Sequence, residues 1–391
     1  MSTRDPQALE QPVPFSGNRF DRMEWAGAFG DLGTLIPFVV AYITLLKVDP
    51  LGILFGFGAV MVAAGFYYRT PFPVQPMKAI GAVATTQAAQ SIVITSGAVY
   101  AAGLVTGVIW LLLGVTGAAK KVAEIVSRPV ALGIVLGLGF GFMIEGVKMM
   151  SGNWWLGAIA LAGTLLLLTN RTIPAMFLLL VFGGVAAVIT QPQLVDELAQ
   201  IRLSFRAPSF TLSTIGWSDL VIGTLFLALP QVPLTLGNAI VAITEENNKL
   251  FPDRPVTEKG VSISTGILNL FGAAVGGIPM CHGAGGMAGH VRFGARTGGA
   301  TIILGTMLIA VALIFGSSVE TLFKIFPVPV LGVILFLTGG QLALGSCDFS
   351  RDKGERFVTL ATAAFAVWNI GIAFVFGLAA YYAHKRGLFR L

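Results

Sequence analysis

Charged residues are scarce in this chain. Only 11% of its 391 residues are Asp, Glu, Lys or Arg, whereas 55% are hydrophobic and the mean hydropathy is +0.82. A soluble protein carries about a quarter charged residues, so a soluble globular domain is excluded. Only two cysteines and three histidines are present. We therefore expect no disulfide framework, no metal site and no cofactor.

Long apolar stretches make up most of the sequence. Segments of about 20 apolar residues recur from Trp25 to His384, which predicts an all-α polytopic membrane protein. The expected spans, about fourteen and some of them short, are 25–46, 50–68, 76–94, 98–117, 129–149, 153–169, 172–190, 218–244, 257–276, 283–295, 299–316, 328–345, 355–368 and 370–384. Residues 1–23 are polar and are expected to be a cytoplasmic tail rather than a signal peptide.

The net charge of +6 follows the positive-inside rule better than it indicates nucleic-acid binding. Of the 25 Lys and Arg residues, 19 fall in the alternate loops of one side and five in those of the other, and Lys78 lies within a span. This bias predicts a multi-pass protein of the inner membrane with both termini cytoplasmic. No nucleic-acid partner is expected.

The chain contains a hidden repeat. A polar, amphipathic connector at 191–217 separates residues 24–190 from residues 218–384, and 385–391 form a short tail. "GDLGTLIPFVVAY" and "PFPVQPMKAIGA" in the first half correspond to "LPQVPLTLGNAIVAI" and "GGIPMCHGAGGMAG" in the second. Each half places a segment broken by Gly and Pro third among seven. Because seven is odd, the halves must insert in opposite orientations, and paired broken segments indicate a transporter's binding site.

The first broken segment contains three prolines and a lysine. Pro71, Pro73 and Pro76 force extended backbone up to residue 75 and favour a helix beginning at Pro76. Extended backbone within a membrane must line a cavity in the protein, so residues 76–94 are predicted to form a half-helix that starts inside the molecule. Lys78 lies in its first turn, where a cation opposes the helix dipole unless an anion binds. We favour this role over a snorkelling lysine.

The second broken segment repeats this design with small residues. Gly283, Ala284 and Gly285 expose backbone N–H groups with little obstruction, directly after His282. Two opposed half-helix starts would form a pocket of donors for a compact, multiply charged oxyanion. His282 either titrates there or is a structural donor.

Other polar residues near the breaks are candidates for the same site. Gln75, Gln231, Thr235 and Asn238 either donate to the anion or satisfy loose backbone and join helices. Asp31 is an ionisable residue in apolar surroundings. It is expected to pair with Lys78, with a coupled proton or a helix cap as the alternatives.

These motifs resemble the molybdate transporter family, a relative of the sulfate permeases. The resemblance rests on "GDLGTLIPF" (30–38), "PVQPMKAIGA" (73–82), "QVPLTLGNAI" (231–240) and "PMCHGAGGMAGHVRFGARTG" (279–298). It implies a 7+7 inverted repeat, with a core domain from spans 1–4 and 8–11 and a gate domain from spans 5–7 and 12–14. Substrate then lies between the starts of spans 3 and 10. The sequence ends seven residues after the last span, so the regulatory domain that sulfate permeases usually carry is not expected.

The sequence thus predicts a secondary transporter that moves a tetrahedral oxyanion by alternating access. Molybdate is the first choice, with sulfate or tungstate next, and the coupling ion and a homodimer are left open. A nucleobase carrier of the same fold is the nearest alternative, but the start of span 10 has no acid and span 3 has a lysine. An anion channel is a further alternative. No HExxH or GxSxG motif supports an enzyme.

Overall fold

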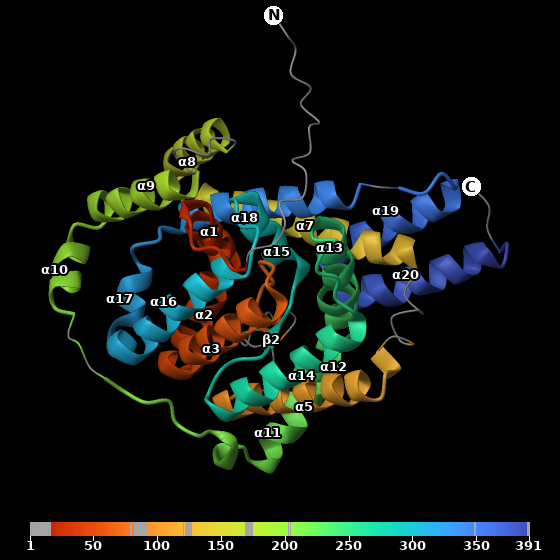
Figure 1. The fold of residues 1–391 in the computed structure, drawn as a ribbon, viewed down its shortest axis with the longest axis horizontal. Coiled ribbons are helices and arrows are strands. Elements are labelled where there is room, and N and C mark those ends of the chain that lie inside the picture. The colour runs from red at the N-terminus through yellow and green to blue at the C-terminus, as the bar shows by residue number, and fades with distance from the viewer. Residues whose placement is uncertain are drawn as a thin grey trace, which may run out of the picture.

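The chain folds into a bundle of helices around a short strand pair (Figure 1). The computed structural model describes residues 17–78, 80–81, 93–119, 121, 127–168, 175–201, 203, 205–347 and 349–388. Most helices begin and end close to the bounds predicted from the apolar stretches. For example, the span expected at 50–68 is α3, Pro50–Tyr68.

The elements before the connector are mostly helices. In chain order they are α1 (Arg22–Ala28), η1 (Phe29–Asp31), α2 (Leu32–Leu46), α3 (Pro50–Tyr68), β1 (Gln75–Pro76), α5 (Ser96–Val115), α7 (Arg128–Ser151), α8 (Trp154–Leu167) and α9 (Ala175–Thr190). The connector itself holds α10 (Gln193–Ala199) and η3 (Leu212–Thr214), and it runs down one edge of the molecule in Figure 1.

The elements after the connector follow a similar course. They are α11 (Trp217–Ile222), η4 (Gly223–Ala228), α12 (Leu229–Leu234), η5 (Thr235–Ala242), α13 (Ile243–Leu250), α14 (Glu258–Ala274), β2 (Met280–Cys281), α15 (Ala284–Arg292), α16 (Gly299–Phe315), η6 (Gly316–Ser318), α17 (Val319–Phe323), α18 (Val328–Gly345), α19 (Lys353–Trp368) and α20 (Ile370–Lys385).

The span expected at 218–244 is a continuous helical rod with two π-helical stretches, η4 and η5. Pro230 and Pro233 have no N–H to donate, so regular α-helical hydrogen bonding cannot run through this rod. π-helical turns recur at functional sites because they shift side chains out of register. Here they place Thr235 and Asn238 inside the protein, where both are buried.

Several helices are long and apolar enough to cross a membrane alone. In the described residues these are Arg22–Ile43, Pro50–Tyr68, Ser96–Val115 and Arg128–Ser151, while α9 and α10 form a pair bent by 107°. Shorter apolar helices include Trp154–Leu167, Trp217–Ala228, Gly299–Phe315 and Val328–Leu337. This set is typical of a multi-pass membrane protein. The larger number of spans stays a prediction.

The two halves of the chain interleave. α3 packs on α16, α5 on α14 and α7 on α18, so each of these pairs joins one half to the other. Gly58 and Gly305 mark one contact: a Cβ added to either would lie 2.6 Å from the other's carbonyl oxygen. Small residues allow helix backbones to touch in this way within lipid.

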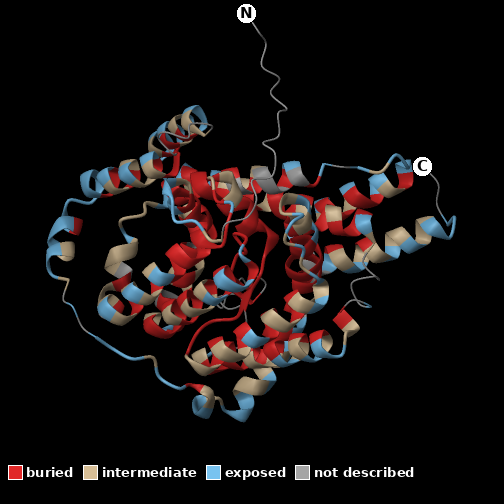
Figure 2. Cartoon of the chain, in the orientation of Figure 1, coloured by how far each residue is buried: buried red, intermediate tan, exposed pale blue. Residues whose placement is uncertain are grey.

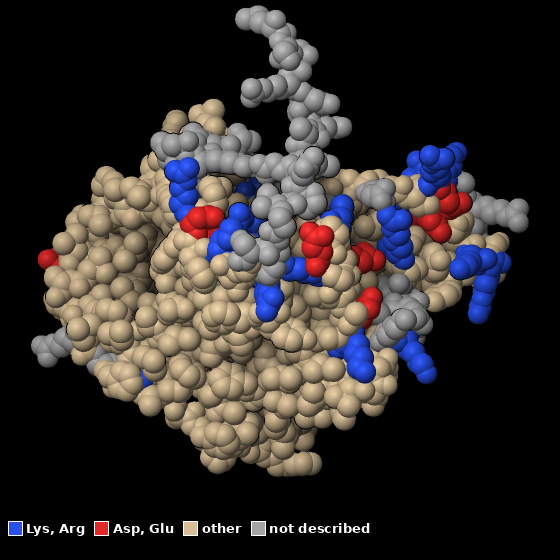
Figure 3. Space-filling view, in the orientation of Figure 1, with Lys and Arg blue, Asp and Glu red and all other residues tan. Residues whose placement is uncertain are grey.

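Buried residues concentrate around the centre of the bundle, whereas the outer helix faces are exposed yet apolar (Figure 2). Large exposed side chains such as Trp155, Leu166 and Val181 are what a lipid-facing surface requires. Charged side chains gather toward one side of the face shown in Figure 3, and the opposite side of that face is almost free of charge.

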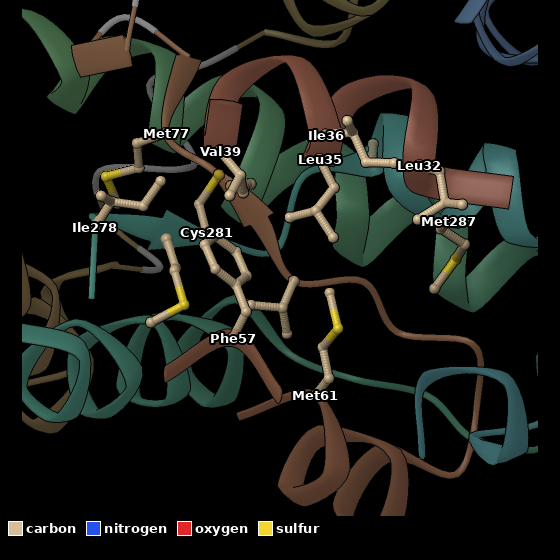
Figure 4. Packing of buried hydrophobic residues seen from close by; sticks show 14 of the residues in the cluster. Leu32, Leu35, Ile36, Val39, Phe57, Met61, Met77, Ile278, Cys281 and Met287 are labelled. Carbon is tan, nitrogen blue, oxygen red and sulfur yellow. The ribbon is translucent and has the colours of Figure 1, made fainter. Parts of the chain in front are cut away.

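The core surrounds the strand pair. Gln75 pairs with Cys281 and Pro76 with Met280 in antiparallel register, and these are the only strands in the described residues. Side chains of α2 and α3, including Val39 and Phe57, pack beside Cys281 (Figure 4). The pair thus ties together residues about 200 positions apart.

Candidate anion-binding site

The strand pair positions two helix starts at the centre of the molecule. Each strand is followed by a helix: one begins at Lys78 and the other, α15, at Ala284. Because the strands are antiparallel, these helix starts lie at opposite ends of the pair. α15 has nine residues, so it is about 14 Å long, roughly half the hydrocarbon thickness of a membrane.

The prediction that the first helix begins at Pro76 was wrong by two residues. Pro76 belongs to β1, and the N–H of Met77 donates to the carbonyl of Pro279 at 2.9 Å, which prolongs the pairing. Helix follows at Lys78, Ile80 and Gly81. Residues 79 and 82–92, the remainder of the predicted half-helix, lie outside the described residues.

Gln75 is the hub of the polar contacts. Its Nε2 donates to Asp31 Oδ1 at 2.6 Å and to Thr34 Oγ1 at 2.9 Å, and its Oε1 accepts from Lys78 Nζ at 3.4 Å. Thr34 Oγ1 also donates to Asp31. All but Lys78 are buried. The amide therefore links an acid to a base in a place with little water.

The expected ion pair between Asp31 and Lys78 is not formed. Ion pairs in the described part of the chain do not include one between these two residues. The Gln75 amide stands between them, donating to the one and accepting from the other. Nor does the Asp31 side chain cap α2. The Asp31 carboxylate and the Lys78 ammonium are connected through the Gln75 amide instead.

Lys78 lies at the boundary with α7. Its Nζ is 4.3 Å from the centroid of the Phe142 ring, which α7 supplies. A cation over an aromatic face is attracted by the ring quadrupole. As far as the described residues go, this contact and the long 3.4 Å bond to Gln75 leave the ammonium with donor capacity for a ligand.

Close packing defines the start of α15. A Cβ on Gly283 would lie 2.3 Å from Gln75 Oε1 and 3.1 Å from Asn238 Nδ2, and one on Gly286 would lie 2.9 Å from Asp31 Oδ2. Gly283, Ala284 and Gly285 are buried. The first N–H groups of a helix have no partner within it, so this first turn is a source of donors.

The three residues predicted from the motif "LPQVPLTLGNAIVAI" of the second half lie beside these helix starts. Gln231 accepts from the Ile80 N–H at 3.3 Å and donates to Thr235 Oγ1 at 3.0 Å. Asn238 faces Gly283, and its buried Oδ1 has no hydrogen-bond partner among the described residues. Gln231 thus bonds to the backbone of the first helix start, which agrees with the alternative that it satisfies loose backbone. Asn238 borders the second helix start.

His282 is fully engaged within the protein. Its Nδ1 lies 2.8 Å from the carbonyl of Pro73, and its Nε2 lies 2.8 Å from Ser264 Oγ, which in turn contacts Tyr68 Oη at 2.5 Å. The ring also meets Phe72 edge to face. With both nitrogens occupied, His282 fits the structural role that the sequence left open.

Sequence reasoning missed Asn269 of α14. Its Oδ1 accepts from the Met280 N–H at 2.9 Å, and its Nδ2 donates to the Met280 carbonyl at 2.7 Å. The Asn269 amide therefore makes the pair of backbone hydrogen bonds with Met280 that a neighbouring strand would make on the free edge of β2. The signal available in the sequence was an amide residue within an otherwise apolar helix. No sequence feature indicated that Phe142 would contact the site.

The arrangement collects a lysine ammonium, a helix start and an amide at one place. A sequence model of the family described as "Molybdate transporter of MFS superfamily" matches residues 23–142 and 223–342, more than half of the chain. The chain belongs to this molybdate transporter family. Both matched stretches contain part of the site: Lys78 lies in one, and Asn238 and Gly283 in the other.

Relatives align over nearly the whole chain. Molybdate transporter 2 of Arabidopsis thaliana is 33% identical over 403 residues, covering 90% of this chain and 85% of the relative. Molybdate transporter 1 of Chlamydomonas reinhardtii is 30% identical over 472 residues, covering 91% and 90%. Both relatives are named as transporters.

Solved structures show the fold. The transmembrane domain of the cyanobacterial bicarbonate transporter BicA matches with a TM-score of 0.60 at 15% identity, covering 92% of this chain and 98% of that domain. Murine Solute Carrier 26 family member A9, an anion transporter in the inward-facing state, matches with a TM-score of 0.64 at 14% identity, covering 95% and 69%. The chain therefore has the fold of these transporters.

Proposed function

We propose that this chain is a secondary transporter that moves a tetrahedral oxyanion, molybdate first and sulfate or tungstate next, by alternating access. The observation that carries the proposal is the strand pair with a helix start at each end, beside Lys78 and Asn238. Helix N-termini and an ammonium are suited to an anion. The relatives named as molybdate transporters support the choice of ion.

The anion is placed between the helix starts at Lys78 and Ala284. Lys78 and the N–H groups of Gly283, Ala284 and Gly285 would donate to it, with Asn238 at the edge. Gln75, Gln231 and Thr235 would hold these donors in place, and His282 would fix the lead-in to α15. One side-chain cation and two helix dipoles offset a dianion only in part, which allows release.

The proposed architecture is fourteen spans in a 7+7 inverted repeat, residues 24–190 and 218–384, joined by 191–217. Broken spans three and ten would be half-helices. The contact of Lys78 with Phe142 of α7 would then lie between a core domain and a gate domain. The interleaved pairing of α3, α5 and α7 with α16, α14 and α18 supports this division.

Binding to the purified protein tests the function. We expect saturable molybdate binding in isothermal titration, competition by sulfate and no competition by uracil, because the site offers donors and a cation. Competition by uracil alone would point to a nucleobase carrier. Uptake into proteoliposomes that does not saturate would favour a channel.

The proposed topology places both termini in the cytoplasm of a cell whose inner membrane holds the protein. Leu388→Cys, at an exposed site, is to be made with Cys281 and Cys347 replaced by Ser. We expect an impermeant maleimide to label it only after the cells are permeabilised. Ser151→Cys, at the exposed end of α7, is the matched control and should be labelled from outside. Labelling of residue 388 in intact cells would contradict the topology.

A further inference from the structure

Within the described residues, two buried ionisable side chains each have one satisfied atom and one atom without a partner. Asp31 is 1% exposed and His290 is 0% exposed. Asp31 Oδ1 accepts from Gln75, and His290 Nδ1 lies 2.8 Å from the carbonyl of Gly27. Asp31 Oδ2 and His290 Nε2 are buried and have no hydrogen-bond partner in the part of the chain that the structure describes. Such atoms are costly unless something binds them.

These two side chains belong to elements in close contact. η1, which ends at Asp31, packs on α15: a Cβ on Gly30 would lie 2.3 Å from the Gly289 carbonyl oxygen and 3.0 Å from the His290 N. Asp31 Oδ2 itself faces Gly286, one turn before His290 on the same helix. The acid and the imidazole are therefore neighbours across the η1–α15 contact.

The hydrogen bond to Gly27 fixes the tautomer of His290. A carbonyl oxygen only accepts, so Nδ1 must carry the hydrogen and donate it. In the neutral ring the lone pair is then on Nε2, the unpartnered atom. His290 therefore offers one proton-accepting atom, Nε2, on the helix that packs against η1 and Asp31.

Among the described residues, few other charges lie near this pair. Lys78 and the Cys281 thiol also lie near Asp31, and the other charged side chain of α15 is that of Arg292. Glu24 of α1 is already occupied by the N–H groups of Arg296, Thr297 and Ala300. Tyr42 is the titratable residue of α2, and α18 and η5 have none. Glu145 of α7 pairs with Lys148 at 3.4 Å, and Glu245 and Glu246 of α13 are not fully buried.

We propose that Asp31 Oδ2 and His290 Nε2 together bind a proton that is co-transported with the anion. The inference rests on the proposed oxyanion transport. The proton comes from water on one side, binds to the Nε2 lone pair and returns to water on the other side, so no electron is transferred. It adds one positive charge beside a site where a dianion meets a single lysine, which favours loading both together.

Proteoliposomes of the full chain test this coupling. An inward proton gradient is expected to raise molybdate accumulation by about tenfold per pH unit and per proton, and a trapped pH dye should report acidification with uptake. His290→Asn keeps an amide donor for the Gly27 carbonyl but has nothing at Nε2. We expect it to bind molybdate and to lose both the response to the gradient and the acidification. His384→Gln, at the far end of α20, is the control and should keep both.

The outcomes separate this inference from the function itself. Wild-type protein that neither binds nor transports molybdate would refute the function. Binding with uptake that ignores the proton gradient, or that follows a sodium gradient, would overturn the proton site alone, as would coupling that persists in His290→Asn. His290→Gln and Asp31→Asn serve if the Asn variant does not fold. Wild-type titrations in buffers of different ionisation enthalpy give a second measurement: no net proton uptake on binding would also overturn it.

Discussion

Lys78→Gln is expected to weaken molybdate binding roughly 10- to 150-fold. Glutamine keeps hydrogen-bonding ability but removes the charge, and a hydrogen bond to a charged group contributes about 1.5–3 kcal/mol. Among the described residues, the ammonium contacts Gln75 Oε1 at 3.4 Å and the face of the Phe142 ring. Loss of this ammonium should therefore lower the affinity for the anion more than the stability of the fold. Titration of monodisperse protein with molybdate measures the effect.

Two further variants sharpen this test. Lys78→Arg should also bind poorly, because the planar guanidinium is larger than the ammonium and does not fit a tight first turn. Lys148→Gln is the matched control: its side chain is 68% exposed and pairs with Glu145, so its affinity should not change. If Lys78 were only a structural strut, folded Lys78→Gln protein would bind molybdate as the wild type does, and the proposed role would be refuted.

Asn269→Ala is expected to lower the free energy of unfolding by about 2–6 kcal/mol and to abolish tight binding. The change leaves the Met280 N–H and carbonyl buried without their partners, at about 1–3 kcal/mol each. Because β2 leads directly into α15, a loosened Met280 would also displace the donors of Gly283 and Ala284. Thermal unfolding in detergent and molybdate titration measure the two effects.

Asn248 offers an unusually close control for this prediction. Its amide holds the backbone of Val256 with the same pair of hydrogen bonds, at 2.8 and 3.0 Å, but in a half-buried loop. Asn248→Ala should cost less stability, because water can replace the lost partners, and should bind normally. An Asn269→Ala protein that folds and keeps the wild-type affinity would show that the two hydrogen bonds from Asn269 to Met280 do not position the site.

Local chemistry explains what the sequence could predict. Apolar composition gave the bounds of α3 and α5 closely, and the prolines at 71, 73 and 76 correctly predicted extended backbone before a helix start. Lys78 was placed in the first turn for the same reason. These features depend on a few neighbouring residues and need no knowledge of the rest of the chain.

The remainder depends on contacts between distant residues. No residue near Gln75 in the sequence indicates that it pairs with Cys281. Because the strand pairing includes Pro76, the helix begins at Lys78 and not at Pro76. The Asp31–Lys78 ion pair was wrong because a third side chain, Gln75, occupies the space between. His290 lay within a quoted motif, yet only the Gly27 carbonyl, 263 positions away, reveals its tautomer.

The β1–β2 pair also has a mechanical consequence. Backbone hydrogen bonds, the Met77–Pro279 contact and the Asn269 clamp fasten the two helix starts into one rigid part. If access alternates, both starts must travel together, so the distance between the donors stays constant throughout the cycle. Selection among anions would then depend on this constant distance between the donors. Opening would come from movement of the two helix starts together relative to α7, where the Phe142 ring contacts Lys78.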